Sequence, residues 1–237
     1  MSVWEWFTDP ANWTGDNGIP IRTWEQIVIS FWAMMIALIV AMPIALYLGH
    51  KRKGILLATN VGNIGRAIPT LGLLTILASI PEIGIGNLAA ILALALFAIP
   101  PLLTNTFAGM AAVDDKVIDA AHGMGMGTGR ILTRVELPLA LPLIAAGVRT
   151  ATVQVIATAS LAALVGGGGL GRYVVDGYAL QDNTLIVAGA ILTAAVAMVA
   201  ELILAFLQKR VTPKGLREQS LAEEEAAEIP TPAPASP

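Results

Sequence analysis

The sequence contains no cysteine and few charged residues. The lack of cysteine excludes disulfides, thiolate metal ligands and thiol nucleophiles. Asp, Glu, Lys and Arg make up only 13% of the 237 residues, about half the share that soluble globular domains carry. Hydrophobic residues make up 56%. This composition indicates a membrane protein rather than a soluble one.

The usual sequence patterns of enzymes are also missing. No G-x-x-x-x-G-K-[ST] phosphate loop occurs, so ATP hydrolysis by that arrangement is excluded. No G-x-S-x-G or H-E-x-x-H pattern occurs either. His50 and His122 lie in different polar segments with no second metal ligand nearby, and we expect both to be solvated. We therefore predict that the chain is not an enzyme, that it holds no cofactor or metal of its own and that it binds no nucleic acid.

Five apolar stretches are long enough to cross a bilayer, which takes about 20 mostly apolar residues in a helix. They are residues 24–48, 55–80, 87–109, 138–165 and 184–207. The predicted fold class is all-α: a polytopic membrane protein with five transmembrane helices in contact with lipid. Residues 1–23 would precede a transmembrane domain at 24–209. Residues 210–237 are rich in acids, alanine and proline and are predicted to be mostly disordered.

The distribution of lysine and arginine predicts the orientation of these spans. If the N-terminus is outside, ten basic residues lie in inner segments: Lys51, Arg52, Lys53, Lys116, Arg130, Arg134, Lys209, Arg210, Lys214 and Arg217. Only Arg22 and Arg172 then lie in outer segments. Because inner loops carry the excess of basic residues, we predict a multi-pass protein of the cell membrane with its C-terminus in the cytoplasm. Several outer aromatic residues would be interfacial anchors: Trp4, Trp6, Trp13, Trp24, Tyr173 and Tyr178.

The polar segment 114–138 interrupts the apolar spans on the predicted cytoplasmic side. Asp114 can cap the start of a helix, and Asp119 lies near its positive end. Gly125 can end that helix, because glycine accepts the positive φ of a helix stop. The result would be a short helix exposed on the inner face.

One apolar stripe runs along this predicted helix at positions i, i+3, i+4 and i+7. Its members are Val117, Ala120, Ala121 and Met124. The two alanines at its centre would let another backbone come close. The helix either rests on lipid headgroups or enters a groove of a cytoplasmic partner, and the stripe by itself leaves both readings open.

The segment 114–138 resembles the EAA loop of ABC-importer permeases, which reads E-A-A, three residues, G, nine residues, I, any residue, L-P. The matching positions are Asp119, Ala120, Ala121, Gly125, Val135, Leu137 and Pro138. Asp replaces Glu at the first position and Val replaces Ile before the final pair. In that family this coupling loop contains a coupling helix that sits in a groove of the ATP-binding subunit.

Three further stretches are similar to permeases of glycine betaine, carnitine and choline importers. They are "RAIPTLGLL", "GMGMGTGRILTRVELPLALPLI" and "GGGGLGRYVVDGYALQDNTLIVAGAI". The resemblance implies the type I ABC-importer permease fold, methionine-permease-like, and the role of permease subunit in an ATP-driven osmoprotectant importer. It also implies three partners: an ABC ATPase that binds ATP and Mg, a second permease, identical or paralogous, and an extracellular substrate-binding protein. The alternatives are a permease for another small solute, such as the amino acid methionine, and an ATP-independent channel or membrane scaffold.

Two other groups of residues are candidates for function. The glycine-rich run of an outer loop is expected to be flexible, and the resemblance implies that the binding protein docks there; its glycines are Gly166, Gly167, Gly168, Gly169 and Gly171. Charged residues inside spans are costly and usually face a bundle interior or water. We therefore regard Arg66, Arg149 and Glu201 as candidates for a pathway lining or an intramembrane ion pair.

Overall fold

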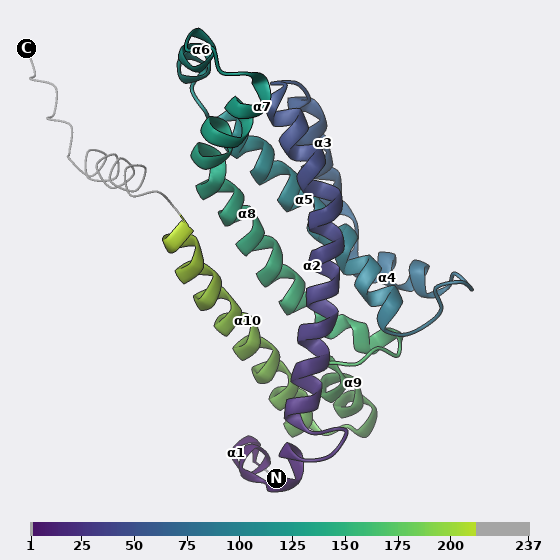
Figure 1. Cartoon of the computed structure of the whole chain (residues 1–237). Helices are drawn as coiled ribbons and strands as arrows, with labels where there is room; N and C mark the ends of the chain where they lie inside the picture. Colours follow the sequence, from purple (N-terminus) through teal and green to yellow (C-terminus); the bar gives the residue numbers. More distant parts are fainter. Residues whose placement is uncertain (1, 212–237) are drawn as a thin grey trace, which may run out of the picture.

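The computed structural model describes residues 2–211, apart from the side chains of Leu57, Ile64 and Arg66, and its regular structure is helical (Figure 1). The predicted tail at 210–237 therefore lies almost wholly outside the described residues. The α-helices are α1 (Val3–Thr8), α2 (Ile19–His50), α3 (Ile55–Ala67), α4 (Thr70–Ala78), α5 (Asn87–Ala111), α6 (Asp115–Gly123), α7 (Thr128–Ile131), α8 (Leu137–Thr158), α9 (Gly171–Leu180) and α10 (Asn183–Val211). Short 3₁₀ segments η1 (Pro10–Trp13) and η3 (Ala159–Val165) and a π-helical turn η2 (Leu132–Glu136) connect them.

Four helical stretches are long and apolar enough to cross a membrane: Ile19–His50, Asn87–Ala111, Thr128–Val165 and Asn183–Val211. They coincide with the first, third, fourth and fifth predicted spans. The second predicted span, 55–80, is not one continuous helix, because it is interrupted at Ile68 and Pro69. Proline disfavours helical geometry in the residue before it, and Ile68 is extended, with ψ of 121°. The 13 residues of α3 and the nine of α4 reach only about 20 and 14 Å, so neither crosses alone.

A stripe of small residues packs α2 against α5 at the centre of the bundle. Ala33, Ala37, Ala41 and Ala45 recur every four residues and are fully buried, and Gly49 continues the stripe to the end of α2. A Cβ added at Gly49 would lie 2.4 Å from the Met110 Cβ. Small side chains at this spacing let helices approach closely, which is how apolar helices associate where lipid removes the hydrophobic driving force.

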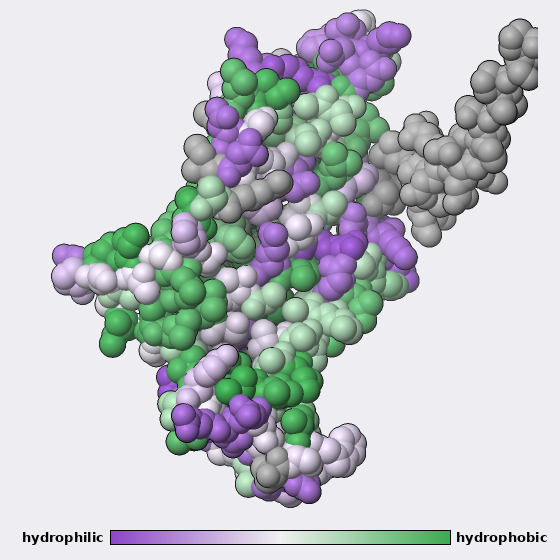
Figure 2. Space-filling model, turned by 180° about the vertical axis from the view of Figure 1, so that it is seen from behind, coloured by the Kyte–Doolittle hydropathy of each residue, from purple (hydrophilic) through white to green (hydrophobic). Residues whose placement is uncertain are grey.

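The polar parts of the molecule gather at two opposite ends. Helices α6 and α7 lie at one end, whereas α1, α9 and the first turns of α2 lie at the other (Figure 1). Figure 2 shows hydrophilic side chains gathered at both ends of the face it displays; apolar and intermediate ones, with some hydrophilic patches, lie between. The 32 residues of α2 measure about 48 Å, more than the ~30 Å hydrocarbon layer of a bilayer. Helix α2 therefore reaches both polar ends.

The N-terminal residues fold back onto α9 and α10. Trp6 is buried and packs edge-on against Tyr173, with ring centroids 5.3 Å apart. The expectation that both are interfacial anchors is therefore wrong, because each is covered by the other. Trp4, Trp13 and Trp24 remain exposed.

Candidate functional site

Helix α6 is fixed at both ends by the residues that the sequence singled out. At its start, an Asp114 carboxylate oxygen accepts a hydrogen bond from the Lys116 N–H at 2.9 Å. At its end, Gly125 has φ of +77°, its N–H donates to His122, and the Met126 N–H donates to Ala121. This pair of bonds is the Schellman arrangement, which satisfies the last helix carbonyls and requires a left-handed residue. The short helix therefore begins and ends where local chemistry dictates.

The apolar stripe of α6 is divided between two faces, which corrects the expectation of a single docking stripe. Ala121 is 2% exposed and lies against the protein itself. Val117 is 41% and Met124 76% exposed, and Ala120 is exposed too. The division arises because Ile118, next to the stripe, packs onto a cluster formed by α5 and α8 and turns Ala121 inward with it. The outward face of α6 therefore presents Val117, Ala120 and Met124, with Asp119 exposed beside them.

The rest of the coupling loop runs continuously into α8. Ile131 of α7 is fully buried. In the π-helical turn η2, the Leu137 N–H donates to the Leu132 carbonyl five residues back. The irregular turn ends two residues before Pro138, which has no N–H of its own to continue the helical hydrogen bonds. Such π-helical turns occur preferentially at functional sites.

Sequence reasoning did not select two residues that contact the coupling loop and the residues before it. They are His50, the last residue of α2, and Arg52, in the turn after it. The expectation that His50 is solvated is wrong, because its Nδ1 lies 2.5 Å from a carboxylate oxygen of Glu136, which is 2% exposed. The Arg52 guanidinium donates hydrogen bonds to the carbonyls of Ala111 and Val113. No local pattern marks these contacts, because Glu136 occupies the variable position of the motif. The basic residues at 51–53 indicated only the orientation of the spans in the membrane.

The glycine-rich loop at the opposite end is fastened to the bundle, contrary to the expectation of a flexible loop. The Gly168 N–H donates to the Asn87 side chain and the Gly169 N–H to Glu25, both at 2.8 Å. The Leu170 N–H donates to Gln26, which is fully buried. A Cβ added at Gly168 would lie 2.5 Å from a Glu25 carboxylate oxygen. These N–H groups are thus occupied by the chain's own side chains and do not form a phosphate-binding loop.

A polar cleft of about 440 Å³ lies beside this loop, lined by Gly166, Gly167, Gly168, Asn87 and the charged residues Arg22, Glu25 and Arg172. Arg22 forms an ion pair with Glu25 at 2.8 Å. Behind it, burial raises the pKa of the Tyr173 hydroxyl above its usual 10.0, an effect that Arg22 opposes and Glu25 reinforces. The Tyr173 hydroxyl donates to the Asn17 carbonyl at 2.6 Å, so the loop, α9 and the N-terminal residues form one surface.

The structure brings Arg149 and Glu201 together. Arg149 of α8 forms an ion pair with Glu201 of α10 and a hydrogen bond of 3.0 Å to Gln208. The two charged side chains are 36% and 35% exposed, so they lie at the side of the α8–α10 contact rather than inside it. Arg66 lies on α3 and is not part of this group; its side chain lies outside the described residues.

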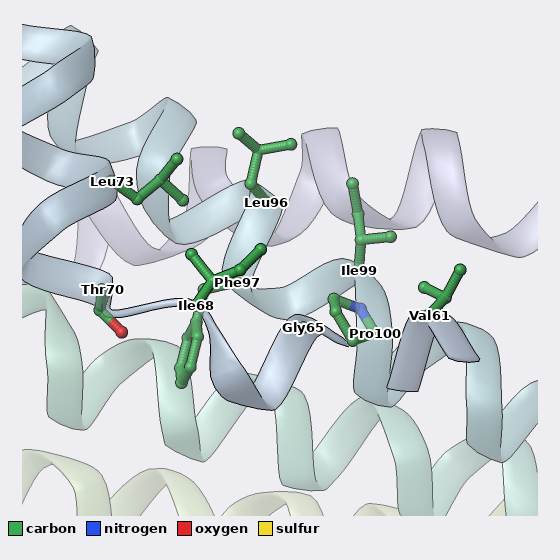
Figure 3. Close-up of a pocket in the computed structure, with 9 residues that line it drawn as sticks. All are labelled: Val61, Gly65, Ile68, Thr70, Leu73, Leu96, Phe97, Ile99 and Pro100. Atoms are coloured by element: carbon green, nitrogen blue, oxygen red, sulfur yellow. The ribbon is translucent and has the colours of Figure 1, made fainter. Parts of the chain in front are cut away.

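An apolar cavity of about 240 Å³ lies where α3 gives way to α4, against α5 (Figure 3). One side of the cavity is lined by Val61, Gly65, Ile68 and Leu73, and the other side by residues that include Phe97 and Pro100. A Cβ at Gly65 would lie 2.1 Å from a Pro100 carbon, so glycine is what lets α3 reach α5 here. The lining carries no charged group, so the cavity offers a charged solute no partner by itself. Residues 2–211 also contain no cluster of His, Cys, Asp or Glu able to hold a metal ion.

Comparison with known proteins gives consistent results in sequence and in structure. Residues 33–214 match the family described as "Binding-protein-dependent transport system inner membrane component". The carnitine transport permease protein OpuCB of Listeria monocytogenes is 37% identical over 205 residues, covering 86% of this chain and 93% of the relative. The glycine betaine/carnitine/choline transport system permease protein OpuCB of Bacillus subtilis is 36% identical over 204 residues, with the same shares covered. A chain of the MetNI methionine ABC transporter in an inward-facing conformation superposes with a TM-score of 0.70 at 22% identity, covering 82% of this chain and 97% of that one.

Proposed function

Because the chain belongs to the family of binding-protein-dependent transport system inner membrane components, we propose that it is the permease subunit of an ATP-driven importer for a small osmoprotectant, such as glycine betaine, carnitine or choline. The observation that supports this class of solute is the 36–37% identity to permeases named for these compounds, over 86% of the chain. The solved amino-acid transporters are 19–23% identical and support the fold alone. Family membership also argues against an ATP-independent channel or scaffold.

The outward face of α6 is the proposed docking surface for the ATPase. Val117, Ala120 and Met124 are exposed apolar residues on a helix that is capped at both ends, the form in which helices enter the groove of a partner. Ala121, Gly125, Leu137 and Pro138 then act indirectly, by holding α6 against the protein and joining it to α8. ATP and Mg would be bound by the ATPase and not by this chain.

In the proposed topology, α3 and α4 together form a broken fifth crossing, and the N-terminus is outside. Six basic residues belong to the end of the molecule that holds α6: Lys51, Arg52, Lys53, Lys116, Arg130 and Arg134. Arg22 and Arg172 belong to the opposite end, beside the glycine-rich loop. The positive-inside rule then puts α6 in the cytoplasm of a cell-membrane protein. The binding protein would dock over the glycine-rich loop.

One chain would supply half of the pathway, and a second permease, identical or paralogous, would complete it. The partly exposed ion pair of Arg149 and Glu201 supports this arrangement. Charges inside a span are expensive to leave facing lipid, and a second permease or a water-filled path against α8 and α10 would cover them.

Reconstituted uptake tests the proposal. The permeases and ATPase are placed in liposomes with the binding protein outside, and labelled glycine betaine or choline is added. We expect accumulation only when ATP is enclosed with the ATPase. The matched control is a complex with a hydrolysis-dead ATPase, and labelled methionine serves as the comparison solute. Equal uptake in the control would refute the importer, whereas uptake of methionine alone would refute the solute class.

A further inference from the structure

The last residue of α2 and the turn that follows it make two contacts with the coupling loop. One contact is at the end of the loop, and the other is at the junction with α5 where the loop begins. His50 and Arg52, which we call the inner clamp, make these contacts. Between the two contacts lie α6, α7 and most of η2. The proposed docking surface is thus held at both of its connections, at one by the last residue of α2 and at the other by the turn that follows α2.

The first contact is a side-chain cap on the end of α5. The last carbonyls of a helix have no partner within it. The Arg52 guanidinium donates 2.5 Å to the carbonyl of Ala111, the last residue of α5, and also donates to Val113. It also lies 3.4 Å from a carboxylate oxygen of Asp115 in the first turn of α6. Arg52 has φ of 52°, a conformation costly for a residue with a Cβ. The backbone therefore adopts an unfavourable conformation at the residue whose side chain reaches this junction.

The second contact is a nearly dry pair of polar side chains. His50 Nδ1 and the Glu136 carboxylate oxygen are 2.5 Å apart, and the side chains are 15% and 2% exposed. Glu136 is the last residue of the π-helical turn, directly before Leu137 and Pro138. Removing one partner of such a pair leaves the other polar group buried without compensation. The exit of the coupling loop therefore cannot move away from α2 without a large local penalty.

The same helix holds the glycine-rich loop at its other end. Glu25 and Gln26, in the second turn of α2, accept hydrogen bonds from Gly169 and Leu170. Between these points the small-residue stripe packs α2 against α5 without an interruption, and the helix continues through Pro43. One continuous helix thus joins the two surfaces proposed to meet the ATPase and the binding protein.

We propose that His50 and Arg52 are positioning residues for energy coupling: they fix the coupling loop to α2, so that movement of α6 by the ATPase displaces α2. This inference depends on the proposed function. Loss of either contact should leave α6 and its docking face in place but let the loop move without α2. ATP hydrolysis would then continue while import and the response to the binding protein fail.

The experiment compares three quantities in the reconstituted complex: basal ATP hydrolysis, its stimulation by the binding protein, and solute imported per ATP. For Arg52→Gln and for His50→Ala we expect solute imported per ATP to fall about tenfold, within the range of mutational effects on coupling, with basal hydrolysis and ATPase co-purification retained. Lys53→Gln, an exposed neighbour with the same change of charge, is the matched control and should behave as wild type. Glu136→Gln keeps the volume but weakens the charge-assisted bond, so it should give a smaller fall in the same ratio even if His50→Ala fails to assemble.

Exchanging the two residues tests whether coupling needs the contact between His50 and Glu136 itself or only one of the two residues. The double variant His50→Glu with Glu136→His should recover import per ATP relative to His50→Ala, and no recovery would overturn the proposal at that contact. Hydrolysis, import and assembly falling in equal proportion in Arg52→Gln and in Glu136→Gln would show a structural role and overturn it as well, as would wild-type coupling in Arg52→Gln and His50→Ala. Failure of the proposed function is distinguishable, because the wild-type complex would then show no ATP-dependent uptake.

Discussion

Replacing Met124 by glutamate tests the outward face of α6 directly. Met124 caps the C-terminal end of α6 and is 76% exposed, so its side chain contributes little to the packing of this chain. The substitution should therefore leave folding and membrane abundance unchanged. It should reduce binding of the ATPase, because a carboxylate would enter an apolar groove.

The expected loss of ATPase binding free energy follows from the exposed part of the Met124 side chain. Burying a whole methionine side chain is worth roughly 1.5–3 kcal/mol, so the exposed three-quarters could contribute roughly 1–2 kcal/mol to docking. A carboxylate left without a partner in the groove adds a penalty of roughly 1–3 kcal/mol. The sum of roughly 2–5 kcal/mol corresponds to a Kd raised at least about 30-fold.

The assay titrates detergent-solubilised permease with ATPase and measures membrane abundance in parallel. His122→Ala is the matched control, since His122 is exposed and its ring nitrogen bonds to Ile118 of the same helix. Ala121→Arg should differ from Met124→Glu: Ala121 is 2% exposed, and overpacking such a site destabilises the fold by roughly 1–3 kcal/mol. Abundance and ATPase binding should then fall together. An unchanged Kd for Met124→Glu would refute the docking surface and favour a helix that rests on lipid headgroups.

Two further substitutions test the opposite end and the ion pair. Gly171→Ala should lower the unfolding temperature of the solubilised protein severely, because the new Cβ would lie 1.8 Å from the Ser160 carbonyl oxygen. Gly127→Ala is the control and should leave the unfolding temperature unchanged, because no atom lies within 4 Å of its Cβ. Equal stability of the two variants would contradict the packing described. Arg149→Ala should lower transport more than folded yield, because the pair with Glu201 is about one-third exposed in this chain and solvent screening weakens such pairs. Thr150→Ala serves as its neighbouring control, and wild-type transport by Arg149→Ala would show that the pair has no role in the pathway.

The sequence predicted features that depend on near neighbours. Apolar length predicted four of the spans, and Asp114 and Gly125 predicted the ends of α6, because capping involves residues only two to five positions apart. The spacing of Asp119, Gly125 and Pro138 indicated the family. The break of the second predicted span also has a local signal, because a proline inside a span, here Pro69, is expected to kink or break the helix.

Amino-acid order by itself determined where α6 begins and ends, which four stretches are apolar enough to cross a membrane, and which family the chain belongs to. Tertiary structure decided which side of each helix is used. Ala121 faces inward because Ile118 packs onto α5 and α8, and helical periodicity cannot tell which of two adjoining faces finds a partner. His50 and Glu136 are 86 positions apart, and the Gly169 bond to Glu25 spans 144. Such contacts exist only because α2 extends between the two polar ends, so chain folding, and not local pattern, brings these polar groups together.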